Sequence, residues 1–447
     1  MKIKNIFCSI GLVALFASCD YLDIKPVGRV IPEKTTEFRA LMVSAYNTGF
    51  DYKYLLSLRA DEVIPPGDAY YYTNLIDFAT WNDNSPNMSA SYPWSTPYKA
   101  IFYANSVLAD VMNAEEDTDA DSREQILGEA YLLRAYLHFD LLNLYGAPYN
   151  PATASTDEGI PLALEIDIEQ TYRRATVEQV YAQVFSDIER GRASLTVDRQ
   201  PVSTSYRFSR LSADAFEARV RLYHQDWSRA LELAESVIAS CPLEDLNVST
   251  DTLPYDISSS EAILCLEKWG NYDIENYTVV LPNLSEKYDA AGDLRYALYF
   301  SQDADRLIPS KGASDDRHKV AIRSAEMYLV AAEAAAHLDG QLEKARTLLK
   351  ELMSKRLAPD YYAGRAAAVD AMTADELLRE IMDERARELA LEGHRWFDLR
   401  RTTRPEIVKH YTDDQGQPQT ATLSADDPRY TVSLPTEATE SNPNLSN

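Results

Sequence analysis

The sequence predicts a mostly α-helical protein: a scaffold of tetratricopeptide-like helical hairpins that carries long irregular loop insertions. Three observations predict this class. Apolar residues recur at helical spacing in several windows, capping boxes open long helices, and small residues repeat at the spacing of a helical hairpin. The composition agrees, because 45% hydrophobic and 26% charged residues in 447 positions allow a large core.

The chain begins with a segment typical of export signals. Residues 1–4 are basic, and residues 6–17 form an apolar run. That run is too short to span a bilayer core, which needs about 20 residues in a helix. We therefore expect residues 1–18 to be a signal peptide.

Cysteine follows at the expected cleavage point. Ala17 and Ser18 precede Cys19, as in a bacterial lipobox, although Phe16 stands where that motif usually has Leu. We expect Cys19 to be lipidated and residues 19–447 to form the mature domain of an exported lipoprotein, which its acyl chains would anchor to a membrane. A plain signal peptide with an incidental cysteine is the alternative.

Capping boxes place the starts of three long helices. The first helix is expected to end near Tyr145 because Gly146 follows, and the third to run toward Gly393. The three boxes are Ser122-x-x-Gln125, Thr176-x-x-Gln179 and Thr373-x-x-Glu376.

Apolar spacing alone predicts the other helices. One begins after a cap at Thr35-Thr36, and another covers 97–112. Two helical hairpins are expected, over 208–240 and 321–356.

An internal repeat supports the helical hairpins. Small residues, with a closing proline, fall at tetratricopeptide-like spacing within 212–242, and Ala332–Leu357 repeats the pattern less faithfully. Any tightly packed helix pair can produce this spacing, so the signal is moderately specific. The positions of the first repeat are Ala218, Ala230, Ala234, Val237 and Pro242.

Two segments lack clear periodicity. Residues 46–100 and 242–320 are rich in Tyr, Asn, Asp, Ser and Pro. Long ordered loops of this kind are uncommon in a plain helical bundle and are often functional. We expect loops and short strands there.

Composition excludes several functions. The net charge of −26 disfavours nucleic acid, which requires a basic face. Gly146 and Gly159 are the closest pair among 15 glycines, 13 positions apart, so no Gly-rich dinucleotide or P-loop motif exists. The chain has 29 Tyr, more than its 12 Phe and 5 Trp together, and tyrosine suits both cores and binding surfaces.

Cysteine and histidine give no metal motif. There is no C-x-x-C, and the six histidines are never within five positions of each other. Cys241 and Cys265 could pair, but buried thiols are the favoured interpretation. The acidic stretch 115–121 fails the calcium-loop pattern, with Ser122 and Gly128 at demanding positions. We predict no cofactor and no metal.

Four stretches resemble the SusD/RagB family of outer-membrane nutrient-capture lipoproteins of Bacteroidetes. The most specific is the last, which is similar to the C-terminal family signature nearly throughout. The stretches are Cys19–Pro26, Glu129–Gly146, Ala321–Ala335 and Asp383–Arg400.

The resemblance implies a non-catalytic protein that captures an oligosaccharide at the cell surface. It also implies a partner, a SusC-like TonB-dependent transporter that receives the ligand. Peptide capture, as in the RagB branch, is an alternative. The resemblance further implies that the irregular segments build the ligand face.

Candidate ligand residues were sought in the irregular segments, because sugars need flat aromatic platforms and a few polar groups. The Tyr70–Tyr72 triplet cannot all face one way, and Trp94 and Tyr98 are interpreted as helix packing. The candidates are Tyr70, Tyr71, Tyr72, Asn74, Asp77, Trp81, Tyr92, Trp269, Asn271, Tyr272 and Tyr277.

The composition of the 383–400 signature also resembles that of an active site, because it contains His394 and several carboxylates. We interpret it as structural, with Trp396 and Phe397 packing. A glycoside hydrolase would need two carboxylates about 5–9.5 Å apart across a cleft, and no catalytic motif supports one. A pure tetratricopeptide scaffold would leave the aromatic insertions unexplained.

Overall fold

The computed structural model describes residues 32–48, 51–83, 85, 92–117, 121–166, 171–312, 317–319 and 321–445. The signal peptide, the lipidation site Cys19 and the Cys19–Pro26 stretch lie outside these residues and stay predictions.

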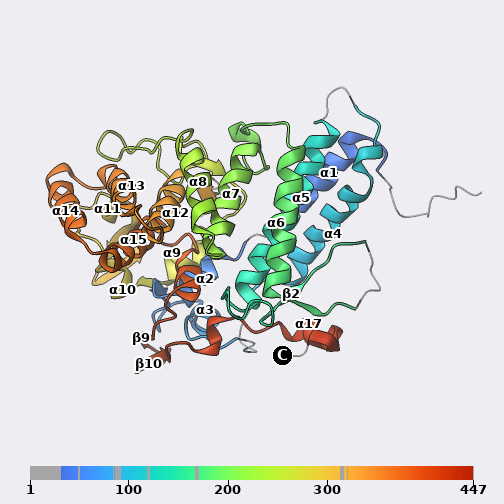
Figure 1. Ribbon diagram of the computed structural model, residues 1–447. Helices are drawn as coiled ribbons and strands as arrows, with labels where there is room; N and C mark the ends of the chain where they lie inside the picture. The colour runs from blue at the N-terminus through green and yellow to red at the C-terminus, as the bar shows by residue number, and fades with distance from the viewer. Residues whose placement is uncertain are drawn as a thin grey trace, which may run out of the picture.

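Long helices form a row of packed pairs, which confirms the predicted fold class (Figure 1). At one end α5 packs against α4 and α6, and α1 packs against α4 and α5. The row continues through α7 and α8 to α12, which contacts α13 and α15. The helices are α1 Thr35–Tyr46, α4 Ser95–Asp110, α5 Arg123–Tyr145, α6 Val177–Ser194, α7 Arg210–Tyr223, α8 Trp227–Ile238, α12 Ser324–Ala336, α13 Leu342–Ser354, α14 Pro359–Ala371 and α15 Ala374–Glu388.

Local capping explains the helix starts. Ser122 accepts a hydrogen bond from the backbone N–H of Gln125, and the boxes at Thr176 and Thr373 close in both directions. Two boundaries differ from expectation. The first helix begins at Thr35, whose hydroxyl accepts from the Asp117 N–H instead of capping. The last long helix stops at Glu388, because Leu391 and Gly393 adopt left-handed φ angles of 64° and 77°.

Short elements fill the irregular segments and the C-terminal region. Strands pair antiparallel in twos among the described residues. The pairs are β1 Val63–Ile64 with β5 Val279–Val280, β2 Glu158–Pro161 with β3 Arg174–Thr176, β4 Ala262–Leu264 with β8 Ile322–Arg323, β6 Phe300–Asp303 with β7 Arg306–Pro309, and β9 Ile407–Thr412 with β10 Pro418–Leu423. The short helices are α2 Lys53–Arg59, α3 Tyr72–Ala79, α9 Tyr272–Tyr277, α10 Pro282–Ser285, α11 Tyr296–Tyr299, α16 Arg395–Arg401 and α17 Thr436–Ser441.

A buried ion network joins the second irregular segment to the helices. Arg295, Arg323 and Arg356 donate to Glu388, with N···O distances of 2.8, 2.6 and 3.0 Å. Burial alone would raise the pKa of Glu388, but the three guanidinium groups hold it well below its ordinary value. We call these three arginines, with Glu261, Asp293, Lys311, Glu384, Glu388 and Glu392, the buried ion network.

This network explains the C-terminal signature. Glu384, Glu388 and Glu392 lie within 383–400 and are all buried, as are Trp396 and Phe397. The structure therefore confirms a packing role for the signature. Cys241 and Cys265 are both buried and free, so they do not pair in this fold.

Candidate functional site

The β1–β5 ladder brings the two irregular segments together. Val63 pairs with Val280 and Ile64 with Val279, although more than two hundred positions separate the strands. Because α3 begins shortly after β1 and α9 ends just before β5, the aromatic residues of both segments meet at this ladder.

Four of the predicted tyrosines form one cluster. The ring centroids of Tyr71 and Tyr277 lie 5.0 Å apart, Tyr70 and Tyr71 4.7 Å, and Tyr272 and Tyr277 6.0 Å. Such edge-to-face pairs hold rings in fixed orientations. We call Tyr70, Tyr71, Tyr272 and Tyr277 the tyrosine cluster.

The cluster has an inner and an outer pair. Tyr71 and Tyr277 are half-buried against the core. Tyr70 and Tyr272 are 80% and 56% exposed, so their apolar faces remain available to a ligand. An exposed aromatic pair supported by a fixed inner pair is a preorganised platform.

Polar groups accompany the cluster on α9. Asn271 caps this helix by accepting from the Asp273 N–H at 2.7 Å, so its side-chain oxygen is already used. Burial raises the pKa of Glu275 to about 7, which allows this carboxyl group both to donate and to accept near neutral pH.

Several other predicted ligand residues are core residues instead. Trp81 and Trp269 are each 2% exposed, and Tyr72 and Tyr92 are also buried, so none presents a face to a ligand. The Trp81 indole N–H donates to the Arg59 carbonyl at 2.8 Å, and the Lys409 ammonium lies 4.6 Å from its ring centroid.

Trp269 is enclosed in the same way. A Cβ at Gly312 would lie 2.2 Å from its ring, so the loop backbone packs directly on the indole. Of the polar candidates, Asp77 is buried and accepts from the Asn82 amide at 2.7 Å, while Asn74 is half-buried on α3. The structure therefore contradicts the prediction that five of the candidates contact the ligand: Trp81, Trp269, Tyr72, Tyr92 and Asp77.

A cavity of about 620 Å³ lies next to the β1–β5 ladder. Two of its lining residues, Asp68 and Val279, are two positions along the chain from Tyr70 and Tyr277. Asp68 and Arg306 both line this cavity and form a two-pronged ion pair, in which the guanidinium donates to the two carboxylate oxygens at 3.0 and 3.1 Å. The Arg306 guanidinium holds the pKa of Asp68 below its ordinary value. We call this cavity the acidic pocket; its charged lining residues are Asp68, Asp305, Arg306, Asp413 and Asp414.

One wall of the acidic pocket was missed at the sequence level. His410, Tyr411, Asp413 and Asp414 come from the β9–β10 hairpin. A weak signal was present, because the turn residues Asp413–Gly416 follow a segment, 407–412, that contains the strand-favouring residues Ile, Val, Tyr and Thr. Gly67 permits the contact, since a Cβ there would lie 1.9 Å from the Asp413 carbonyl oxygen.

The part of the chain that the structure describes contains no helix long and apolar enough to cross a membrane. Nor do its described residues form a cluster of three or more metal-ligating side chains.

Comparison with known proteins identifies the family. A family model described as starch-binding and associating with the outer membrane matches residues 20–222, and the SusD family model matches 301–446. A SusD-like protein of Formosa agariphila is 27% identical over 495 residues, covering 90% of this chain and 92% of its own.

Solved structures share the fold. A SusD superfamily protein from Bacteroides fragilis has a TM-score of 0.76 at 21% identity, covering 94% of this chain and 100% of its own. A laminarin-binding SusD-like protein has a TM-score of 0.61 at 21% identity, covering 83% and 92%.

Proposed function

The chain belongs to the SusD/RagB family, and from that premise we propose that it captures a neutral oligosaccharide at the cell surface and delivers it to a SusC-like TonB-dependent transporter. Proteins of this family are binding proteins, so the chain is not an enzyme. We further propose that Cys19 carries the lipid anchor, after removal of 1–18, and that 19–447 act as one domain.

The exposed pair Tyr70 and Tyr272 carries the proposal. Sugar rings present apolar C–H faces, which stack on flat aromatic rings, and hydroxyl edges, which need donors and acceptors. The acidic pocket beside the platform supplies those groups from Asp68 and Arg306. One site therefore offers both kinds of contact.

Charge favours an uncharged ligand. Four of the five charged residues that line the acidic pocket are aspartates, and the whole chain carries −26. A sulfated or uronate-rich glycan would be repelled by this field. We therefore expect neutral oligosaccharides to bind better than polyanionic ones.

The test is a glycan and peptide array probed with the soluble chain 20–447, followed by calorimetry on the hits. Tyr272→Ala should weaken binding about 5- to 30-fold, since losing a binding-platform aromatic costs about 1–2 kcal/mol. Tyr362→Ala, a half-buried tyrosine on the distant α14, is the matched control.

Other outcomes decide against parts of the proposal. Binding of peptides alone would place the chain in the RagB-like peptide branch. Release of shortened products would contradict a pure capture role. Failure of the tagged lipoprotein to co-purify with an outer-membrane barrel from its native envelope would contradict delivery to a transporter.

A further inference from the structure

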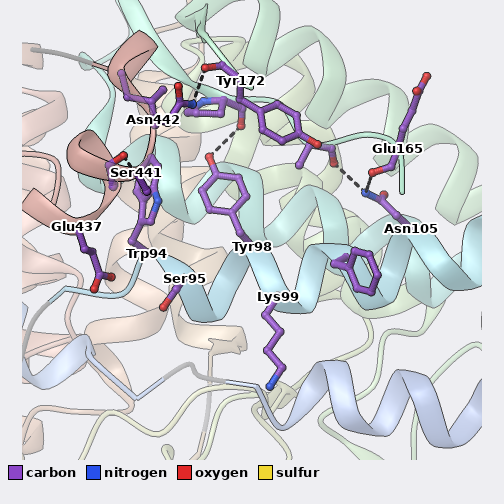
Figure 2. Close-up of a pocket in the computed structure, with 15 residues that line it drawn as sticks. Trp94, Ser95, Tyr98, Lys99, Asn105, Glu165, Tyr172, Glu437, Ser441 and Asn442 are labelled. Atoms are coloured by element: carbon purple, nitrogen blue, oxygen red, sulfur yellow. Dashed lines mark hydrogen bonds between the residues drawn. The ribbon is translucent and has the colours of Figure 1, made fainter. Parts of the chain in front are cut away.

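A second cavity lies between α4 and the C-terminal segment (Figure 2). In the row of helices, α4 lies on the opposite side of α5 from α7 and α8 (Figure 1). The volume of the cavity is about 720 Å³, within the usual range of small-ligand sites. It shares no lining residue with the tyrosine cluster or the acidic pocket. We call it the C-terminal pocket, because α17 and Leu445 form one wall.

Aromatic side chains form the opposite wall. Trp94, Tyr98 and Phe102 are spaced four residues apart, so they project from one face of α4. All three are half-buried, which leaves part of each ring facing the cavity. Tyr172, from the residues before β3, adds a fourth ring.

Hydrogen bonds hold both walls in place. The Tyr98 hydroxyl (labelled in Figure 2) donates to the Pro161 carbonyl at 2.9 Å. The Asn442 amide donates to the Tyr172 carbonyl at 2.8 Å and ties the C-terminal segment to the β2–β3 connection. These hydrogen bonds fix the positions of the two walls, which lowers the cost of ordering them on binding.

Polar groups at the rim remain available. The side chains of Ser95, Lys99 and Glu437 are exposed and make no hydrogen bond or ion pair to another described residue, and the Lys99 ammonium lies 5.9 Å from the Tyr103 ring centroid. An ammonium, a carboxylate and a hydroxyl group together can donate to and accept from hydroxyl groups of a ligand. Glu165, which is also exposed, lines the pocket too, so its charged residues are one lysine and two glutamates, and this excess of negative charge disfavours an anionic ligand.

We propose that the C-terminal pocket is a second carbohydrate site, which takes a neutral saccharide unit against Trp94 and Tyr98. This inference rests on the proposed function and adds a site to it. Aromatic faces within and hydroxyl-binding groups at the rim match the two surfaces of a sugar ring. The same chain would then hold one oligosaccharide type at two independent positions.

The experiment separates the two sites by mutation. The soluble chain 20–447 and its Tyr70→Ala/Tyr272→Ala variant are tested on an array of neutral oligosaccharides that includes maltohexaose and laminarihexaose. The hits are then titrated by calorimetry. We expect the double variant to retain one saturable site. Adding Trp94→Ala to it should weaken that site at least 10-fold, and Lys99→Ala, at the exposed rim, should weaken it several-fold.

Tyr362→Ala, at a half-buried position on the distant α14, is the matched control, because this residue does not line the pocket. Binding by the unaltered chain but none by the double variant would overturn the second site and leave the proposed function standing. Residual binding unaffected by both Trp94→Ala and Lys99→Ala would place the second site elsewhere. Absence of any saccharide binding by the unaltered chain would overturn both proposals.

Discussion

The buried ion network and the tyrosine cluster both connect distant parts of the chain, but they differ in their exposure to solvent. Each joins the second irregular segment to a distant part of the chain, through Glu388 in one case and the β1–β5 ladder in the other. In the network every charged group is buried and paired. In the cluster Tyr70 and Tyr272 remain largely exposed.

The difference shows what a family signature marks. Residues 383–400 are the most recognisable part of the sequence, yet they supply the network and the core. Buried ion pairs tolerate few replacements, because removing one partner leaves an uncompensated charge. A binding surface has no such constraint, so the proposed ligand face lies in segments without a recognisable pattern.

The largest expected effect comes from Glu388→Gln. The change leaves three buried guanidinium groups facing a neutral amide and should lower the free energy of unfolding by about 3–5 kcal/mol. Urea denaturation measures it, with the exposed Glu351→Gln on α13 as control. A loss below about 1 kcal/mol would contradict the importance of the network.

Trp81→Ala tests the boundary between core and ligand face. Removing this buried ring should cost about 3 kcal/mol of stability, since it is enclosed by Arg59 and Lys409. The affinity of the folded variant for a hit glycan should not change. If calorimetry showed a loss of affinity and thermal unfolding showed unchanged stability, Trp81 would be a ligand contact after all.

Acid should weaken the network in a defined direction. Burial would raise the pKa of Glu388, but Arg356, Arg323 and Arg295 hold it well below 4.5 in the folded protein. Its stabilising contribution is therefore present above about pH 4.5 and is lost as the pH falls below that value, where the unfolded chain takes up the proton first. The stability gap between wild type and Glu388→Gln should stay nearly constant from pH 7 to about pH 5 and shrink as the pH falls below about 4.5, as measured by urea unfolding.

Tyr70→Ala tests whether the exposed part of the tyrosine cluster serves binding and not stability. Because the side chain is 80% exposed, its removal should change the free energy of unfolding by less than about 0.5 kcal/mol. Binding of a hit glycan should nevertheless weaken, by about 5- to 30-fold in calorimetry. Equal losses of stability and affinity would indicate a structural ring.

Asp68→Asn, like Tyr70→Ala, should have only a small effect on stability. Asp68 and Arg306 form an exposed ion pair, and such pairs contribute about 0–1 kcal/mol. Thermal unfolding should detect little change, while the salt dependence of glycan binding should alter if the acidic pocket contacts the ligand. An unaltered binding isotherm would remove the acidic pocket from the proposed site.

Sequence patterns identified much of the fold and about half of the candidate site. The capped helix starts, both hairpins and the packing role of Trp396 follow from local spacing. The ends of α1 and α15 were harder, because tertiary contacts and backbone conformation decide them. The residues of the β9–β10 hairpin, which form one wall of the acidic pocket, show only a weak hairpin pattern in the sequence.

By itself the sequence determined the helical scaffold and the two irregular segments, because caps and apolar spacing act between residues three or four positions apart. Only the tertiary structure decided which aromatics lie outside. Tyr272 and Trp269 stand three positions apart in the same segment, yet one is exposed and the other enclosed by Gly312. The burial of a side chain depends on which distant segments of the chain pack against it. The residues next to a tyrosine or tryptophan in the sequence do not predict those contacts.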